Sequence, residues 1–326
     1  MAEEKRRIRV AVVGAGMMGH HHLRIYDNLK GVDLVGLVER DQERALHAAN
    51  QYGIEVFGGV EDLVGKVDAA SIASPSITHG EIGVFLLGNG IHCLIEKPLA
   101  VTELQCLSLI ETAKIAGVQL MVGHVERFNP AVRQLAAILA EGHQVHAVDV
   151  RRLSSASGRI TDVDVVADLM VHDLDIVLSL VQRPIVELTA KAVSTSGRGG
   201  DYVTALLSFD GGVLGTVTAS RITQNKVREL SVTTDLGLIQ IDYSAQTLNI
   251  FRQGDTAVKR MPGDFGSYHL DIMMERALVR NSEPLVLELQ HFVDCARSGE
   301  KPLVSGEDAL EALRLVWRIQ NSYSQV

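Results

Sequence analysis

Val10-Ala11-Val12-Val13-Gly14-Ala15-Gly16-Met17-Met18-Gly19 joins an apolar strand to a G-x-G-x-x-G turn and then to a helix. Gly14 permits a tight turn, Gly16 lets the backbone approach a pyrophosphate, and Gly19 allows the helix to pack closely on the strand. Free N–H groups at the start of the helix can then hold phosphates. The motif alone is a weak signal, since glycines also end strands for local reasons. We expect a dinucleotide to contact this turn at Gly14, Gly16, Met17, Met18 and Gly19.

The next strand, Leu34–Val38, ends at Glu39, twenty residues beyond Gly19. Dinucleotide-binding domains place at this distance the carboxylate that hydrogen-bonds the adenosine ribose hydroxyls. Glu39 would repel a 2′-phosphate, which favours NAD. Arg40 could pair with such a phosphate or lie over the adenine, so NADP stays the minority alternative.

Length and composition predict two domains without a membrane span. The chain has 326 residues, of which 46% are hydrophobic, enough to bury a core in each domain. No stretch reaches the ~18 uninterrupted apolar residues of a membrane helix, and no signal-peptide apolar region precedes the first strand. We therefore expect a soluble, cytoplasmic protein with no membrane partner.

Charge and cysteine content exclude further classes of protein. The net charge is −9, from 40 acidic and 31 basic residues spread without long blocks, so we expect no nucleic-acid partner. The three cysteines are isolated, so neither a disulfide framework nor a C-x-x-C metal site is indicated.

Two architectures follow one another along the chain. Residues 1–122 alternate short apolar runs with helical segments, which predicts an α/β Rossmann domain with a parallel sheet covered by helices. Residues 123–326 begin with helices around Pro130–Glu141 and Val166–Leu180, followed by strands joined by short turns. This order predicts an α+β domain with a large, mostly antiparallel open sheet. The last helices could pack back on the first domain.

Two places could carry proton chemistry. Lys97 ends a buried strand and precedes Pro98, and ligands of open α/β sheets bind beyond such strand ends. The alternative is a Glu96–Lys97 pair at the surface. Asp168 and His172 have an i, i+4 spacing that sets a carboxylate beside an imidazole, as a general base requires. Alternatively, Asp168 only caps the helix and His172 only fills a polar niche.

Other polar clusters have simpler interpretations. His20, His21 and His22 point about 100° apart on a helix, so they cannot all face one ion, and we predict no metal site. Arg127, Arg151, Arg152 and Arg159 concentrate positive charge near the expected domain junction, where a diphosphate could be held bidentately. A solvated basic rim is the competing interpretation. Asn129 and Pro130 are also typical of a helix start.

Taken together, these residues resemble the Gfo/Idh/MocA family of sugar and cyclitol dehydrogenases over nearly the whole chain. The resemblance rests on Gly14–Gly19, Ser74-Pro75-x-x-Thr78-His79, Glu96-Lys97-Pro98, Asp168-x-x-x-His172, His291-Phe292-Val293-Asp294 and Lys301-Pro302. It implies NAD as cofactor and catalytic positions at Lys97, Asp168 and His172. It also implies that Ser74, Pro75, His79 and Glu96 contact the cofactor.

Within the family, Gly123–Pro130 and Arg151–Leu153 are most similar to the branch that oxidises the C3 hydroxyl of UDP-N-acetylglucosamine. Its 3-keto product is aminated by an aminotransferase, in one setting for lipid A. The resemblance implies a homodimer or homotetramer, with a nucleotide sugar facing Arg127, Asn129, Arg152, Arg159 and His172. Another sugar or inositol dehydrogenase and a non-enzymatic NAD-binding sensor remain alternatives.

Overall fold

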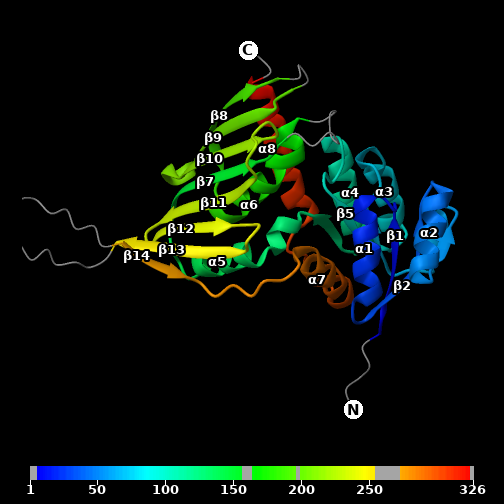
Figure 1. Cartoon of the computed structure of the whole chain (residues 1–326). Helices are drawn as coiled ribbons and strands as arrows, with labels where there is room; N and C mark the ends of the chain where they lie inside the picture. Colours follow the sequence, from blue (N-terminus) through cyan, green and yellow to red (C-terminus); the bar gives the residue numbers. More distant parts are fainter. Residues whose placement is uncertain (1–5, 156–163, 196–198, 254–271, 324–326) are drawn as a thin grey trace, which may run out of the picture. The chain divides into compact units, whose positions relative to one another are not determined.

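The computed structural model describes residues 6–155, 164–195, 199–253 and 272–323, and these form two compact units (Figure 1). Unit 1 comprises Met1–Phe128 and Glu283–Arg314, and unit 2 comprises Asn129–Ser282 and Leu315–Val326.

Unit 1 is built on a six-stranded parallel sheet with the order β3-β2-β1-β4-β5-β6. The order reverses between β1 and β4, which is the switch point where open α/β sheets bind ligands. Most positions of the central strands are buried, as expected for strands covered on both faces. The strands are β1 (Ile8–Val13), β2 (Val32–Val38), β3 (Glu55–Phe57), β4 (Ala69–Ile72), β5 (His92–Glu96) and β6 (Leu120–Gly123).

Helices follow the strands of unit 1, and α4 carries typical capping residues at both ends. The Thr102 hydroxyl accepts a hydrogen bond from the Gln105 amide at 3.3 Å, and Gly117 ends that helix in the left-handed region. The helical elements are α1 (Met17–Asn28), α2 (Gln42–Tyr52), η1 (Val60–Leu63), η2 (Ser76–Thr78), α3 (His79–Gly88), α4 (Glu103–Ala116), η3 (Val125–Phe128) and α7 (Pro284–Ser298).

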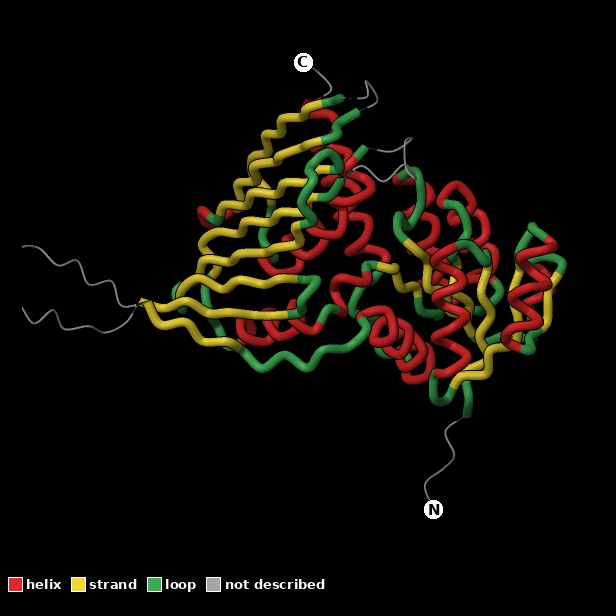
Figure 2. The backbone as a smooth tube through the Cα atoms, viewed as in Figure 1, coloured by secondary structure: helices red, strands yellow, loops and turns green. Residues whose placement is uncertain are grey.

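Unit 2 contains an eight-stranded sheet with the order β14-β13-β12-β11-β7-β10-β9-β8, in which only β7 and β10 pair in parallel within the described residues. Figure 2 shows α5, α6 and the end of α8 gathered on one face of the sheet. The core of this unit includes Val150, Leu230 and Ile239. The strands are β7 (Val145–Leu153), β8 (Ile185–Val193), β9 (Tyr202–Phe209), β10 (Leu214–Ser220), β11 (Val227–Thr234), β12 (Gly237–Asp242), β13 (Thr247–Gln253) and β14 (Ile272–Arg276). The helical elements are α5 (Pro130–Ala140), the π-helical turn η4 (Val166–Met170), α6 (Val171–Val181), η5 (Asp210–Gly212) and the end of α8 (Gly306–Tyr323).

The predicted fold class is confirmed, but several boundaries differ. The first unit extends through Phe128 rather than Val122, because the buried Phe128 ring packs on His291 of α7, with the ring centroids 5.5 Å apart. The helix α7 and the first part of α8 also belong to unit 1. The sequence reading missed the short strands β3 and β14, each at one edge of its sheet.

Candidate active site

The glycine turn at the carboxyl end of β1 has the close packing that its motif predicts. Gly14 has φ +94°, and a Cβ there would lie 2.8 Å from the Ala73 carbonyl oxygen. A Cβ on Gly19 would lie 1.8 Å from the Gly14 carbonyl oxygen. Gly16 instead faces open space, because a Cβ there would meet no atom within 4 Å, and no side chain caps the helix that follows. This open cradle of backbone fits the pyrophosphate of a dinucleotide.

Glu39 lies against the same turn. Its Oε2 accepts a hydrogen bond from the Ala15 amide at 2.7 Å, and its Oε1 accepts one from the Asp41 amide at 2.9 Å. These two bonds fix the carboxylate at the end of β2, beside the strand that carries the glycines. Arg40 and Met17 are exposed.

His79 connects two loops at the carboxyl edge of the sheet. Its side chain is almost fully buried, with Nε2 2.9 Å from the Ser74 carbonyl oxygen and Nδ1 2.8 Å from the Pro98 carbonyl oxygen. The His79 ring therefore lies between the loop that follows β4 and the loop that follows β5. The Ser74 hydroxyl also bonds Thr78 at 2.7 Å, which braces the loop after β4.

Lys97 follows β5 at this same edge and is half-buried. Glu96 points into the unit, where its Oε1 lies 3.1 Å from His22 Nε2 and its Oε2 accepts a bond from the Lys97 amide at 3.2 Å. Only 8% of Glu96 is exposed, so the alternative of a Glu96–Lys97 surface pair is wrong. The Glu96 carboxylate acts inside the unit and holds the Lys97 backbone, rather than reaching outward to a cofactor.

Asp168 and His172 lie in consecutive helical elements of unit 2, in η4 and in the first turn of α6, and both are half-buried. The cap of this helical stretch is Asp164, whose Oδ1 accepts bonds from the amides of Val166 and Ala167 at 3.2 and 3.1 Å. Asp164, and not Asp168, therefore caps this helical stretch.

Arg152 has a structural role, contrary to the expectation that it contacts substrate. Strand alternation turns Arg152 of β7 towards the core, where its Nε and Nη2 bond Asp173 at 2.6 and 2.8 Å. Its guanidinium carbon also lies 5.4 Å from the centre of the Tyr243 ring. Both charged groups are buried, so this ion pair is part of the core of unit 2.

The remaining predicted substrate residues are placed differently. Asn129 is only 2% exposed, and its side chain accepts from the Ala131 amide and donates to the Tyr243 carbonyl oxygen at 3.0 Å. It is thus a buried helix cap rather than a surface contact. Arg127 is half-buried and donates to the Leu303 carbonyl oxygen at 3.2 Å. Arg159 lies outside the described residues.

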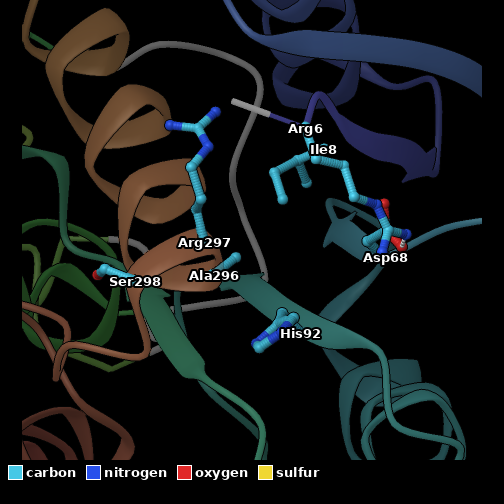
Figure 3. A pocket seen from close by; sticks show the side chains of 7 residues that line it. All are labelled: Arg6, Ile8, Asp68, His92, Ala296, Arg297 and Ser298. Atoms are coloured by element: carbon cyan, nitrogen blue, oxygen red, sulfur yellow. Dashed lines mark hydrogen bonds and ion pairs between the residues drawn. The ribbon is translucent and has the colours of Figure 1, made fainter. Parts of the chain in front are cut away.

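A cavity of about 500 Å³ in unit 1 lies at the opposite edge of the parallel sheet (Figure 3). Ile8 and His92 begin their strands, Asp68 precedes β4, and the remaining walls come from α7 and Arg6. The glycine turn and Lys97 follow the carboxyl ends of those strands, so this cavity is separate from the candidate site.

The sequence reading missed two buried polar residues behind the site, His22 and Glu288. His22 was considered only as a possible metal ligand, but its side chain is fully buried and pairs with Glu96. Its spacing of four from the buried Tyr26 was the available signal, because it places both on one face of α1.

Within the described residues, no helix is long and apolar enough to cross a membrane.

Comparison with known proteins identifies the family of both parts of the chain. Residues 8–124 match a family described as an oxidoreductase family with an NAD-binding Rossmann fold, and residues 144–240 match the GFO/IDH/MocA C-terminal domain. The UDP-N-acetylglucosamine 3-dehydrogenase of Acidithiobacillus ferrooxidans is 30% identical, over 94% of this chain and 95% of its own. The scyllo-inositol 2-dehydrogenase (NAD(+)) of Bacillus subtilis is 26% identical, over 97% and 94%.

A solved structure of the Acidithiobacillus ferrooxidans enzyme superposes with a TM-score of 0.89 at 26% identity, covering 98% of each chain. Both family domains therefore occur here in one chain and in the same order. The chain belongs to the Gfo/Idh/MocA family and is an NAD-dependent dehydrogenase that acts on a CH–OH group.

Proposed function

We propose that this enzyme oxidises the C3 hydroxyl of UDP-N-acetylglucosamine to the 3-keto nucleotide sugar. The observation that carries the proposal is the 30% identity to a UDP-N-acetylglucosamine 3-dehydrogenase over 94% of the chain. The 3-keto product would be the substrate of an aminotransferase that makes a 3-amino sugar, in one setting for lipid A.

The catalytic work is divided among three side chains. His172 acts as the general base that removes the proton of the 3-hydroxyl, and Asp168 orients its imidazole. Lys97 donates a hydrogen bond to the same oxygen and stabilises the negative charge that develops there. Bound NAD supplies the acceptor for the hydride that leaves C3.

The cofactor is held along the carboxyl edge of the sheet in unit 1. The backbone of Gly14, Gly16 and Gly19 faces the pyrophosphate, with Met17 and Met18 opening the helix behind it. Glu39 accepts from the adenosine ribose hydroxyls, which selects NAD over NADP. Ser74, Pro75 and the loop tied down by His79 border the nicotinamide ribose.

The direct test mixes the protein with NAD and UDP-N-acetylglucosamine and follows the absorbance of reduced nicotinamide. Lys97→Ala and His172→Ala should each lose roughly 10²-fold or more in kcat and still bind NAD, as expected for groups in acid–base catalysis. Lys114→Ala and His146→Ala change the same residue types at exposed positions and should keep the wild-type rate. Wild-type turnover in either site variant would refute the assignment.

A second candidate is a dehydrogenase of a free sugar or inositol. It is supported by the scyllo-inositol 2-dehydrogenase relative and by Arg152 and Asn129, whose side chains are engaged inside unit 2 and are not offered to a diphosphate. Glucose and myo-inositol in parallel assays separate the two candidates, and UDP should compete only with a nucleotide sugar.

We also propose that the chain acts in the cytoplasm as a homodimer or homotetramer. Leu206 and Leu214 are 46% and 50% exposed on neighbouring strands of unit 2, where an uncovered sheet face favours association. Sedimentation velocity measures the assembly directly.

A further inference from the structure

Three acid or imidazole side chains meet in the interior of unit 1, behind strand β5, which ends at Glu96 just before Lys97. They are His22 of α1, Glu96 of β5 and Glu288 of α7, which are 0%, 8% and 0% exposed. Ionisable residues are rarely buried so completely unless they are paired. The proposed function gives neither His22 nor Glu288 a role in binding the cofactor or the substrate.

The His22–Glu96 pair connects this interior directly to Lys97. His22 Nε2 and Glu96 Oε1 lie 3.1 Å apart, and Glu96 Oε2 accepts from the Lys97 amide at 3.2 Å. An ionised carboxylate only accepts hydrogen bonds, so Nε2 is the nitrogen of His22 that carries the proton. The carboxylate is therefore held from one side by a helix and holds the Lys97 peptide with its other oxygen. The Glu96 carboxylate also packs closely against Gly123, because a Cβ added at Gly123 would lie only 3.1 Å from the carboxylate atoms.

Glu288 differs from Glu96 because neither of its carboxyl oxygens has a hydrogen-bond partner among the described residues. Burial raises the pKa of Glu288 well above its usual range, and the nearby Glu96 charge raises it further. Burial likewise raises the pKa of the nearby Tyr26 phenol. Glu288 therefore lies in this interior as an uncharged acid.

In the part of the chain that the structure describes, no cationic side chain bonds the Glu288 carboxyl. The buried titratable side chains that share this interior with Glu288 are His22, Tyr26 and Glu96. The other charged or titratable groups on elements that contact α7, and on α7 itself, are Arg9, His20, His21, Arg24, Asp27, Glu126, Arg127, His291, Asp294, Cys295 and Arg297. The four arginines bond elsewhere. Arg9 bonds Asp68, Arg24 bonds Glu283, Arg127 bonds the Leu303 carbonyl, and Arg297 bonds Asp294 and the Gly31 carbonyl.

We propose that His22 and Glu288 are positioning residues for Lys97. His22 fixes the Glu96 carboxylate that holds the Lys97 peptide, and Glu288 fills the space behind them as a neutral acid. A second negative charge at Glu288 would oppose the charge on Glu96 and loosen its hold on the Lys97 loop. The inference rests on the proposed catalytic role of Lys97.

The first experiment measures hydrogen exchange of the Lys97 amide, which requires no substrate. His22→Leu removes the donor to Glu96, and the Lys97 amide should exchange about tenfold faster or more. His22→Gln can present an N–H close to the position of Nε2 and should restore most of the protection. His21→Leu, one residue away at an exposed position of the same helix, should leave the exchange unchanged. Equal Lys97 exchange in the wild type and His22→Leu would overturn the proposal.

The second experiment tests the neutral acid through the pH dependence of unfolding. A carboxyl whose pKa is raised in the folded state lowers stability as pH rises above the ordinary carboxyl range, because the folded state then binds more protons than the unfolded state. Glu288→Gln copies the neutral form and should flatten that part of the stability profile, whereas Glu300→Gln at an exposed site should not. An unchanged profile in Glu288→Gln would refute the neutral acid.

Turnover then separates this inference from the proposed function. His22→Leu should lower kcat about tenfold with an unchanged NAD Kd, and His22→Gln should recover it. Loss of turnover in Lys97→Ala with a wild-type kcat in His22→Leu would refute the positioning role and leave the proposed function standing. Normal turnover in Lys97→Ala would refute the catalytic role of Lys97. The exchange and unfolding results would still decide whether His22 and Glu288 position the Lys97 peptide through Glu96.

Discussion

Replacing Arg152 by Ala tests whether this arginine stabilises the fold or binds the substrate. The Arg152 and Asp173 side chains are only 6% and 0% exposed, and two hydrogen bonds of 2.6 and 2.8 Å join them. Removing one partner of such a buried pair leaves an uncompensated charge in the core. The cost is typically about 3–5 kcal/mol of unfolding free energy. Arg152→Ala also loses the packing of the guanidinium over Tyr243.

The assay is urea unfolding, with thermal unfolding as a second measurement. Each 1 kcal/mol shifts Tm by roughly 2–4 °C in proteins of 150–250 residues, so a fall of at least about 6 °C is expected. Arg151→Ala is the matched control, because Arg151 precedes Arg152 in β7, points to the opposite face of the sheet and should change stability by less than about 0.5 kcal/mol. The double variant Arg152→Met, Asp173→Leu removes both charges and should recover most of the lost stability.

Two results would contradict this reasoning. An Arg152→Ala protein that melts within a degree or so of the wild type would show that the ion pair between Arg152 and Asp173 does not stabilise the core. A rise in the KM for nucleotide sugar at unchanged stability would return Arg152 to the substrate site. The expected pattern is the reverse, with stability lost and the KM of the remaining folded enzyme preserved.

Three further predictions concern the glycine turn, the acid beside it and the cysteines. Gly19→Ala should destabilise unit 1, since its Cβ would lie 1.8 Å from a carbonyl oxygen, and thermal unfolding measures this loss. Gly16→Ala should fold normally and weaken NAD binding, which calorimetric titration with NAD measures. Glu39→Ala should raise the NAD Kd about tenfold and narrow the preference over NADP, measured by titration with each cofactor; an unchanged ratio would exclude its role in selectivity. Burial raises the pKa of Cys106 and Cys295 to about 11, so near neutral pH the native protein should react with iodoacetamide far more slowly than the unfolded protein, as mass spectrometry would show.

Local patterns were sufficient to predict most of the fold. The alternation of apolar runs and helical segments predicted the parallel sheet, and strands separated by short turns predicted the largely antiparallel one. The strands β3 and β14 were missed because three to five residues at a sheet edge carry too little periodicity to be recognised. The π-helical turn that contains Asp168 was read as continuous α-helix, since one residue of extra winding leaves the apolar spacing nearly unchanged.

The sequence by itself determined the candidate cofactor-binding residues that lie in one turn and at the ends of neighbouring strands. The glycine motif and the spacing to Glu39 follow from one strand–turn–helix–strand unit, in which every contact is close along the chain. Only the tertiary structure decided which face Arg152 presents and which residues stand behind Lys97. A strand gives each side chain one of two faces, and the arrangement of helices over the sheet decides which of them is buried. His22, Glu96 and Glu288 come from three distant segments, so their shared burial exists only once α1 and α7 pack together.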